Sequence, residues 1–367
     1  MNRFTKRVFC IAAALMLCVV CLCPAASAAE GGTETQLTIL CSNVGGLPIP
    51  MLFSPGHKFV PRTQAVLGRM LNESGADIVC VQEDFQYHDL LANQMTSYPY
   101  STFTSGGIPA GDGMNIFSKY PIYNVDRVAW DAFNGILKYD NDGLTPKGFM
   151  RCTVDVDGVL VDLYNIHTDA SRALEDQLAK KAQFLQLLSY IAAQPQDRPV
   201  LITGDMNCTL HTYYYAELYE TMIAQAGYRD GWAEVVNGGD YLRGENAQEL
   251  IDAYNARYDG KFWGRWDSYE RLLYRDGGGA AVTATDFRYD FYTDRPDKPE
   301  ALTDHAVMRC TVRLDAGAYT RPETALVPPT DRTAREKAAY FLQMCGRCLR
   351  LIAQDVIGAL FYGQPLT

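Results

Sequence analysis

Several features that would assign a protein to a class directly are missing from this sequence of 367 residues. It contains no internal repeat, so a repeat architecture is not expected. It also has no excess of basic residues, because 33 Lys and Arg stand against 43 Asp and Glu, a net charge of −10. This acidic balance argues against tight non-specific binding to DNA, which depends on Lys and Arg opposite phosphates. It does not exclude a nuclease with a local basic patch.

Cysteine and glycine motifs that bind metals or nucleotides are missing too. Cys345 and Cys348 form a Cys-x-x-Cys pair, but no second pair exists beyond the N-terminal segment, so we do not expect a zinc site. A disulfide in an exported protein and an ordinary helix face are the two alternatives for this pair. The glycine-rich segment 106–113 lacks the spacing of a nucleotide-binding loop and is expected to be a turn.

The apolar run Val8–Leu22 is shorter than the roughly 20 residues that a membrane-spanning helix needs. Three basic residues precede it, and the small-residue site Ala26–Ala28 follows it. We therefore expect residues 1–28 to be a signal peptide, cleaved after Ala28, and the protein to be secreted. Cleavage would leave 339 residues with a net charge of −13, because three basic residues and no acidic residue are removed.

Short apolar runs that end in polar side chains recur along the chain. Val200–Ile202 is typical of a buried strand, and Gly204 lets the backbone turn so that Asp205 and Asn207 project from the strand end. The other polar residues at the ends of such runs are Asn43, Glu83, His167, and the pair Asp304 and His305. A strand ending in Gly-Asp is common, so the repetition of the arrangement is the informative feature.

In a layered α/β protein, polar residues at strand ends gather on one rim. Asn, Glu, His and Asp together on a rim suit metal-assisted attack of water on a phosphate ester. The expected strands are Leu37–Ser42, Ile78–Gln82, Met114–Ser118, Met150–Val156, Val159–Ile166, Val200–Ile202, Tyr269–Tyr274 and Ala306–Leu314.

Three helices are expected around these strands. One is Arg62–Ser74, and a second is Ser171–Ala193, capped by Ser171. The apolar stripe predicted for the second helix consists of Leu174, Leu178, Leu185, Leu188 and Ile191. After a linker, 316–330, residues 331–362 are expected to form an amphipathic helix, either packed on the domain or lying on a membrane surface.

Five segments, in order, resemble the signature of the endonuclease/exonuclease/phosphatase superfamily across residues 35–315. They are SNVGGLP, VQED, YNIHTDA, ITGDMN and TDHAVM. The resemblance implies an α/β four-layer sandwich, in which two central mixed β-sheets are flanked by helices. Glu270 stands where the family pattern has Asp, and Thr168 follows His167 where the family more often has Leu.

Within the superfamily, the sequence is most similar to secreted bacterial-type, magnesium-dependent neutral sphingomyelinases. The similarity rests on Leu47-Pro48 after Asn43, on Glu83-Asp84-Phe85, and on Lys147-Gly148-Phe149. It implies that Glu83 is the main ligand of Mg²⁺, assisted by Asn43. Mn²⁺ and Ca²⁺ are the alternative ions, since hard cations prefer oxygen ligands.

The remaining residues receive chemical roles. His305 is the candidate general base, oriented by Asp304 or a nearby carboxylate. His167 is expected to donate to a phosphoryl oxygen, and Asp205 to position water or a second metal ion. Asn207 is expected to hydrogen-bond the phosphoryl group, with Glu270 and Lys147 in support. The other histidines, His57, His88 and His211, have no supporting motif.

These roles predict an exported, divalent-metal-dependent phosphodiesterase that hydrolyses a phospholipid head group, with sphingomyelin as the leading substrate. The alternatives are a secreted deoxyribonuclease-type endonuclease or another phosphate-ester phosphatase with the same site. A binding protein on a decayed enzyme scaffold is disfavoured, because Glu83, His167, Asp205 and His305 are all present. Trp263, Trp266 or the C-terminal helix is the candidate membrane contact, and the alternative for the two tryptophans is a place in the core. Nucleic acid is the less favoured partner, and no oligomeric state is predicted.

Overall fold

The structure, a computed structural model, describes residues 34–48, 61–137, 142–170, 173–209, 218–241, 252, 256, 268–293 and 302–362. All of them belong to one compact unit, Glu34–Thr367. The predicted signal peptide lies outside the described residues, as do Ser171, Trp263, Trp266, His57 and His211.

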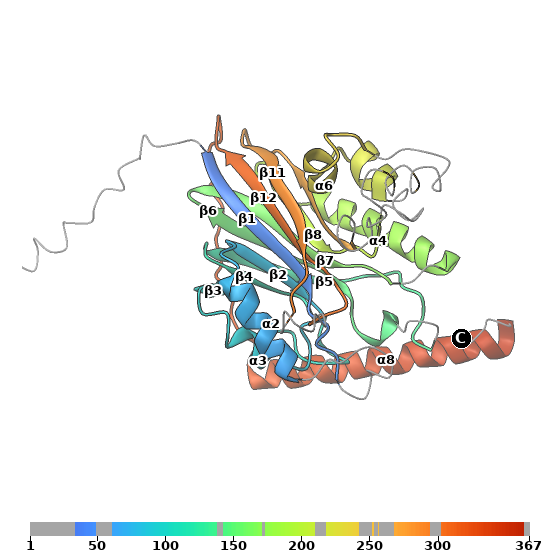
Figure 1. The fold of residues 1–367 in the computed structure, drawn as a ribbon. Helices are drawn as coiled ribbons and strands as arrows, with labels where there is room; N and C mark the ends of the chain where they lie inside the picture. Colours follow the sequence, from blue (N-terminus) through green and yellow to red (C-terminus); the bar gives the residue numbers. More distant parts are fainter. Residues whose placement is uncertain are drawn as a thin grey trace, which may run out of the picture. The chain divides into compact units, whose positions relative to one another are not determined.

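Two six-stranded sheets form the centre of this unit (Figure 1). The strand order of the first sheet is β11 (Ala281–Asp290), β12 (Val307–Asp315), β1 (Glu34–Asn43), β2 (Ile78–Gln82), β4 (Asn115–Ser118) and β3 (Tyr100–Ser101). The order of the second is β5 (Ile122–Ala129), β6 (Gly148–Val156), β7 (Val159–His167), β8 (Val200–Asp205), β10 (Glu270–Arg275) and β9 (Arg229–Asp230). Both sheets are mixed, as predicted.

Each sheet contains one parallel pair, β1 with β2 and β7 with β8, and all other pairs are antiparallel. The carboxyl ends of a parallel pair meet at the same edge of the sheet. Asn43 therefore pairs with Gln82, next to Glu83, and His167 pairs with Asp205. These two pairs contain three of the predicted site residues, and Glu83 is the fourth, directly after β2.

The strands are buried on both faces because they lie between a second sheet and a helical layer. On β1, Ile39 and Cys41 belong to the core between the sheets, whereas Leu40 belongs to a smaller cluster with the helices. Four cysteines predicted to be apolar strand residues are fully buried: Cys41, Cys80, Cys152 and Cys310. They are free thiols, which confirms the packing role expected for them.

Helices cover both outer faces, which confirms the four-layer sandwich. On the first sheet, α2 (Pro61–Glu73) and α3 (His88–Ala92) pack Leu67, Leu71 and Leu91 against the strands. On the second, α4 (Leu174–Ala192) packs Phe184 and Leu187. The shorter elements are η2 (Asp142–Leu144), a π-helix η3 (Tyr219–Gln225) and α6 (Gly231–Val235).

The apolar stripe predicted for α4 is wrong for three of its residues. Leu174, Leu178 and Leu185 are 64%, 59% and 49% exposed. The buried face instead includes Lys180 and Gln183, whose side chains hydrogen-bond backbone carbonyls of neighbouring loops. Polar residues can occupy a buried helix face when their donors and acceptors are satisfied, and hydrophobic periodicity does not reveal such a face.

The chain continues beyond β12 along the edge strand β5. Asn124 exchanges backbone and side-chain hydrogen bonds with Val327 and Ala325, and Arg321 forms a salt bridge with Asp155. The C-terminal helix α8 (Ala334–Tyr362) follows. Among the described residues, no helix is both long enough and apolar enough to cross a membrane.

Candidate active site

Polar side chains from both sheets meet where the parallel strands end. Asn43 Nδ2 donates to Glu83 Oε1 and to Asp205 Oδ2, both at 3.0 Å, so one amide joins the first sheet to the second. Gly204 makes the end of β8 possible, because a Cβ there would lie 1.9 Å from the carbonyl oxygen of Ile166. The structure thus brings together residues 162 positions apart in the chain.

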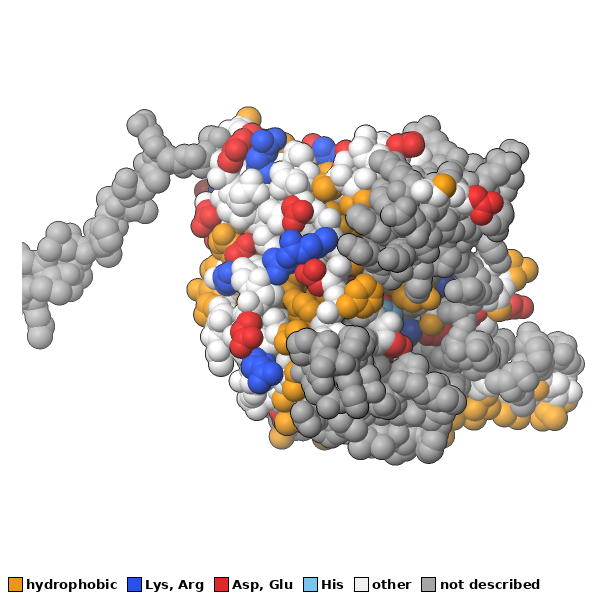
Figure 2. Space-filling view, in the orientation of Figure 1, with side chains coloured by type: hydrophobic (Ala, Val, Ile, Leu, Met, Phe, Trp, Pro, Cys, Tyr) orange, Lys and Arg blue, Asp and Glu red, His pale blue; other side chains and the backbone are white. Residues whose placement is uncertain are grey.

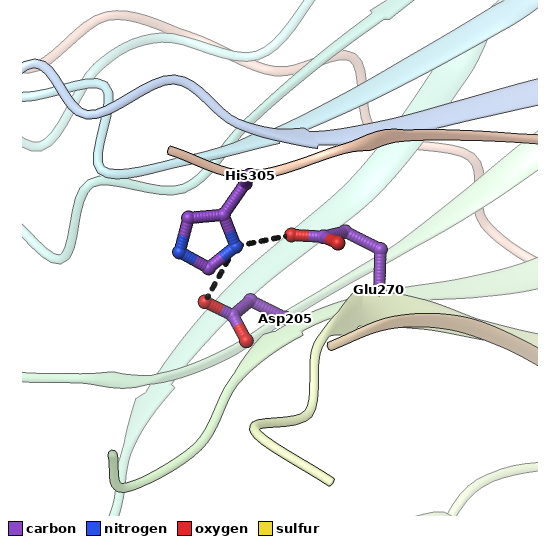
Figure 3. A group of neighbouring side chains, drawn as sticks. All are labelled: Asp205, Glu270 and His305. Atoms are coloured by element: carbon purple, nitrogen blue, oxygen red, sulfur yellow. Dashed lines mark hydrogen bonds and ion pairs between the residues drawn. The ribbon is translucent and has the colours of Figure 1, made fainter. Parts of the chain in front are cut away.

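His305, just before β12, is held by two carboxylates (Figure 3). Its Nδ1 lies 2.6 Å from Glu270 Oε1 and 3.8 Å from Asp205 Oδ2. Glu270 is fully buried at the start of β10, where it pairs with Asp205, and it also accepts a hydrogen bond from Ser268 Oγ at 2.6 Å. The second ring nitrogen, Nε2, points away from both carboxylates.

This arrangement makes His305 strongly basic. Burial alone would lower its pKa, but the negative charges of Glu270 and Asp205 hold the pKa well above the usual value. Burial would likewise raise the pKa of Asp205, but His305, His167 and Asn43 beside it hold that pKa below its usual value. A histidine with one nitrogen fixed by a carboxylate and the other free has the geometry of a general base.

His167 has the opposite character. It is 1% exposed, and burial together with the positive charge of Lys147 lowers its pKa to about 3, so the ring is neutral. Its Nε2 lies 3.5 Å from Asp205 Oδ2, while its Nδ1 has no hydrogen-bond partner in the part of the chain that the structure describes. Trp130 Nε1 donates to the backbone carbonyl of His167 at 2.7 Å and fixes the end of β7. A neutral imidazole can donate one proton to an oxygen without carrying charge into the site.

Glu83 occupies a strained turn directly after β2. Its φ of 54° lies in the left-handed region, which is uncommon for residues other than glycine. Two glycines make room for the turn: Gly46 donates its backbone N–H to the carbonyl of Glu83 at 2.9 Å, and a Cβ at Gly46 would lie 2.6 Å from that oxygen. A Cβ at Gly113 would lie 3.0 Å from Glu83 Cα. Strain of this kind is common at functional sites.

The surroundings of Glu83 suit a cation. Burial raises its pKa, and among the described residues it forms no salt bridge. A carboxylate that burial makes costly to ionise, with no basic partner in contact, is the kind of group that a divalent ion stabilises. Asn43 fits less simply, because its NH₂ group faces Glu83 and its Oδ1 accepts the N–H of Gly45 at 3.0 Å. The amide would have to turn before it could bind a metal ion.

Lys147 reaches the site from the segment before β6. Its Nζ donates to Asp142 Oδ1, and Asp142 Oδ2 accepts the backbone N–H of Ala170 at 3.0 Å. Burial would lower the pKa of Lys147, but Asp142 and Asp169 hold it above its usual value. Burial and the nearby Asp142 raise the pKa of Asp169 to about 8. Lys147 therefore brings a permanent positive charge close to Glu83 and His167.

Two predicted site residues, Asp304 and Asn207, have contacts other than those expected for them. Asp304 is exposed, and the carboxylate in contact with His305 Nδ1 is that of Glu270. Asn207 adopts the left-handed conformation (φ 46°), and its side-chain amide donates to the carbonyl of Thr168 at 3.2 Å. Its backbone N–H donates to Asp205 Oδ1 at 3.0 Å, so Asn207 fixes the Asp205 carboxylate in this structure.

Sequence patterns alone did not single out several supporting residues. Gln82 Nε2 donates to Asn165 Oδ1 at 2.6 Å, a fully buried bridge between the sheets beneath the site. Both residues lie inside the segments VQED and YNIHTDA, which was the available signal. His88, considered a surface or loop residue, contacts Asp84 Oδ2 at 2.6 Å, and this carboxylate raises the pKa of His88 although burial opposes the shift.

Comparisons with known proteins agree with this geometry. The sequence model of the endonuclease/exonuclease/phosphatase family matches residues 42–309. A sphingomyelinase of Mycobacterium bovis is 26% identical over 294 residues, which cover 75% of this chain and 53% of the relative. The chain thus spans about half the length of the curated relatives it matches.

Solved structures show the same fold. Humanized TDP2 of D. rerio superposes with a TM-score of 0.53 at 18% identity and covers 76% of this chain and 98% of its own. A beta toxin variant of Staphylococcus aureus with bound magnesium ions superposes with a TM-score of 0.51 at 18% identity. The match covers 75% of this chain and 99% of that one.

Proposed function

The chain belongs to the endonuclease/exonuclease/phosphatase family, and from this premise we propose that it is a phosphodiesterase that cleaves the head group from a phospholipid, with sphingomyelin as the leading substrate. The observation that carries the proposal is the contact of His305 with Glu270 beside Asp205, at the rim that also holds Glu83 and His167. The sphingomyelinase relatives favour a lipid substrate over nucleic acid.

The chain's own residues supply the proton transfer. His305 Nε2 accepts a proton from the attacking water, while Glu270 holds Nδ1 and stabilises the positive charge that develops on the ring. His167, neutral and buried, donates to a phosphoryl oxygen as that oxygen gains charge. Lys147 adds a nearby positive charge. Asp205 is held between both histidines and aligns them.

A divalent cation completes the proposed site. Glu83 would hold Mg²⁺, a hard cation that prefers oxygen ligands. The beta toxin variant, which has a similar fold, was solved with bound magnesium ions. When bound, such an ion neutralises charge on the phosphoryl oxygens and stabilises the leaving oxygen. Asp205, Glu270 and His305 also bring one ligand atom each within 4.8 Å of one another, but the hydrogen bond between His305 and Glu270 already uses that space. Glu83 is therefore the better metal ligand.

The site would act outside the cell. Residues 1–28 have the basic, apolar and small-residue regions of a signal peptide, so we include secretion and cleavage after Ala28 in the proposal. A secreted phospholipid hydrolase would meet its substrate in an exposed membrane leaflet.

The test is hydrolysis by residues 29–367, with Mg²⁺ or with EDTA, on sphingomyelin vesicles and on plasmid DNA in parallel. Magnesium-dependent release of phosphocholine with intact plasmid is the expected result, and Glu83→Gln and His305→Gln should abolish it. Nicked plasmid with untouched vesicles would replace the lipid substrate by a nucleic acid. Activity in EDTA, or full activity of either variant, would contradict the mechanism.

A further inference from the structure

The helix α8 is fixed on the domain by one side only. Asp355 Oδ2 accepts the backbone N–H groups of Ile136 and Leu137 at 2.8 and 3.0 Å. Arg347 donates to the carbonyl of Gly143 at 2.8 Å, and Cys348 is 8% exposed beside Leu144. These contacts recur at positions seven and eight residues apart, so they determine which face of the helix points inward and which points outward.

The outward face of α8 is apolar. Its large exposed side chains are Phe341 (47%), Leu342 (69%), Leu349 (68%), Ile357 (49%), Leu360 (73%) and Phe361 (75%). Hydrophobic side chains follow this helix along its lower edge in Figure 2. One apolar side chain at the surface is ordinary, but six on one helix form a patch that needs a partner.

The width of this face favours a lipid surface over a second copy of the chain. A coiled-coil seam is a narrow line of residues spaced three and four apart. Leu342, Cys345, Leu349, Ile352 and Val356 have that spacing, but Phe341, Ile357 and Phe361 broaden the face beyond a seam. A broad apolar face is typical of helices that lie in the plane of a membrane interface.

The charges beside the apolar face fit anionic lipid. Arg335 and Arg350 are exposed next to it. The acidic residues of the helix are engaged elsewhere, since Glu336 accepts hydrogen bonds from Thr333 in the first turn and Asp355 binds the domain. The outward face therefore carries positive charge on a chain whose net charge is −10. Such a distribution attracts a negatively charged membrane surface.

The position of α8 links this face to the site. The segment that α8 contacts contains Asp142, which binds Lys147 beside Glu83. The same segment begins at Trp130, which donates to the carbonyl of His167. The residues that α8 contacts and those that hold the catalytic rim thus belong to one stretch of the chain.

We propose that α8 lies in the interface of an anionic, substrate-containing membrane, with its apolar face in the lipid, and thereby presents the catalytic rim to lipid head groups. This inference rests on the proposed function, because it assumes that the substrate is a membrane lipid. In this proposal α8 binds the membrane surface and thereby raises the local concentration of substrate, whereas the catalytic rim hydrolyses the lipid.

The test measures binding and hydrolysis separately. Binding is measured by flotation with vesicles of phosphatidylcholine and sphingomyelin, with and without phosphatidylserine, in a Glu83→Gln background that leaves the lipid intact. The test variant is Leu349→Glu with Leu360→Glu. Its matched control, Gln343→Glu with Gln354→Glu, adds the same charge at exposed positions of the same helix that are already polar. We expect the test variant to bind at least about 30-fold more weakly and the control to bind within about threefold of the parent.

Hydrolysis is then measured with Glu83 intact. Both double variants should cleave the soluble diester bis(p-nitrophenyl) phosphate at the parental rate, and only the test variant should lose activity on vesicles. Equal vesicle binding by both double variants, or none by the parent, would overturn the role of α8 while leaving the phosphodiesterase intact. A parental dimer that the test variant converts to a monomer, measured by light scattering, would also overturn it, because the face would then join two copies. Vesicle binding without cleavage of any diester would instead contradict the proposed function.

Discussion

Replacing Glu270 by Gln removes the charge that holds His305 while keeping the length of the side chain. In the protein, Glu270 Oε1 lies 2.6 Å from His305 Nδ1 and accepts a hydrogen bond from it. A glutamine can turn its NH₂ group toward Nδ1, which would place the ring proton on Nε2 instead. Nε2 would then carry the proton and have no lone pair to accept a proton from water, while the Nδ1 lone pair would be taken up by the glutamine. The variant therefore tests orientation and charge together.

The loss in kcat should be about 10²- to 10⁴-fold, the range for removing a general base or forcing its ring into the wrong tautomer. This range corresponds to about 3 to 5 kcal/mol of activation free energy. Glu270→Asp, which restores the carboxylate but shortens the side chain by one methylene, should lose about tenfold. Ser268→Ala removes only a hydrogen bond to Glu270 and should cost less than about tenfold.

The pH profile separates this mechanism from a general loss of structure. Glu270 and Asp205 raise the pKa of His305, so the rate should increase with pH up to the raised pKa, where the ring becomes neutral. Without the charge of Glu270, the pKa of His305 falls, and the acidic limb of the profile should move to lower pH. The reasoning would be refuted by a Glu270→Gln enzyme with parental kcat, or by an unchanged acidic limb.

Three further predictions follow from other parts of the site. Asp169→Asn should raise the thermal unfolding midpoint relative to the parent, by an amount that grows between pH 4 and pH 8. The pKa of Asp169 is about 8 in the folded protein and about 4 in the unfolded chain. The protonated carboxyl group therefore contributes fully to the free energy of unfolding of the parent below pH 4, and this contribution is lost as pH rises through 8. A constant difference across this range, seen by calorimetry, would contradict the raised pKa. Gly46→Ala should destabilise the fold by about 1–3 kcal/mol and lower activity, because the added Cβ would lie too close to the carbonyl oxygen of Glu83. The control is Gly346→Ala, where an added Cβ meets no neighbouring atom within 4 Å. This control should be neutral or stabilising when unfolding is measured in urea. Mg²⁺ should raise the unfolding midpoint of the parent but not of Glu83→Gln, and an equal shift in both would place the metal elsewhere.

The sequence was most informative where local patterns decide the structure. Ile78–Gln82 is a strand because a short apolar run of β-branched residues lies between turn signals, and the structure has the same bounds. Asn43, Glu83, His167 and Asp205 were predicted at one rim because polar residues at strand ends gather there in a layered α/β protein. The structure places them there through two parallel strand pairs. In these cases each residue's position depends on its immediate neighbours in the chain.

Features that depend on distant residues were not predictable in the same way. The partner of His305 was left open between Asp304 and a nearby carboxylate, since sequence adjacency does not show where a side chain points. The register of β10 on β8 puts Glu270 opposite Asp205 and within reach of His305. Likewise, the strand β11 was missed. A β-bulge between Ala284 and Asp286 shifts its alternation of buried and exposed residues by one position.

The two histidines of the rim show how one site can divide acid and base functions. Both contact Asp205, yet their pKa values are moved in opposite directions. His305 has a second carboxylate, Glu270, and is therefore strongly basic. His167 has no second carboxylate and lies near Lys147, so it stays neutral at every pH at which the protein would work. Groups whose pKa values are separated by their surroundings can act in different steps. The position of one carboxylate on β10 and of one lysine before β6 therefore accounts for the opposite pKa shifts on which the proposed roles rest, proton removal by His305 and hydrogen-bond donation by His167.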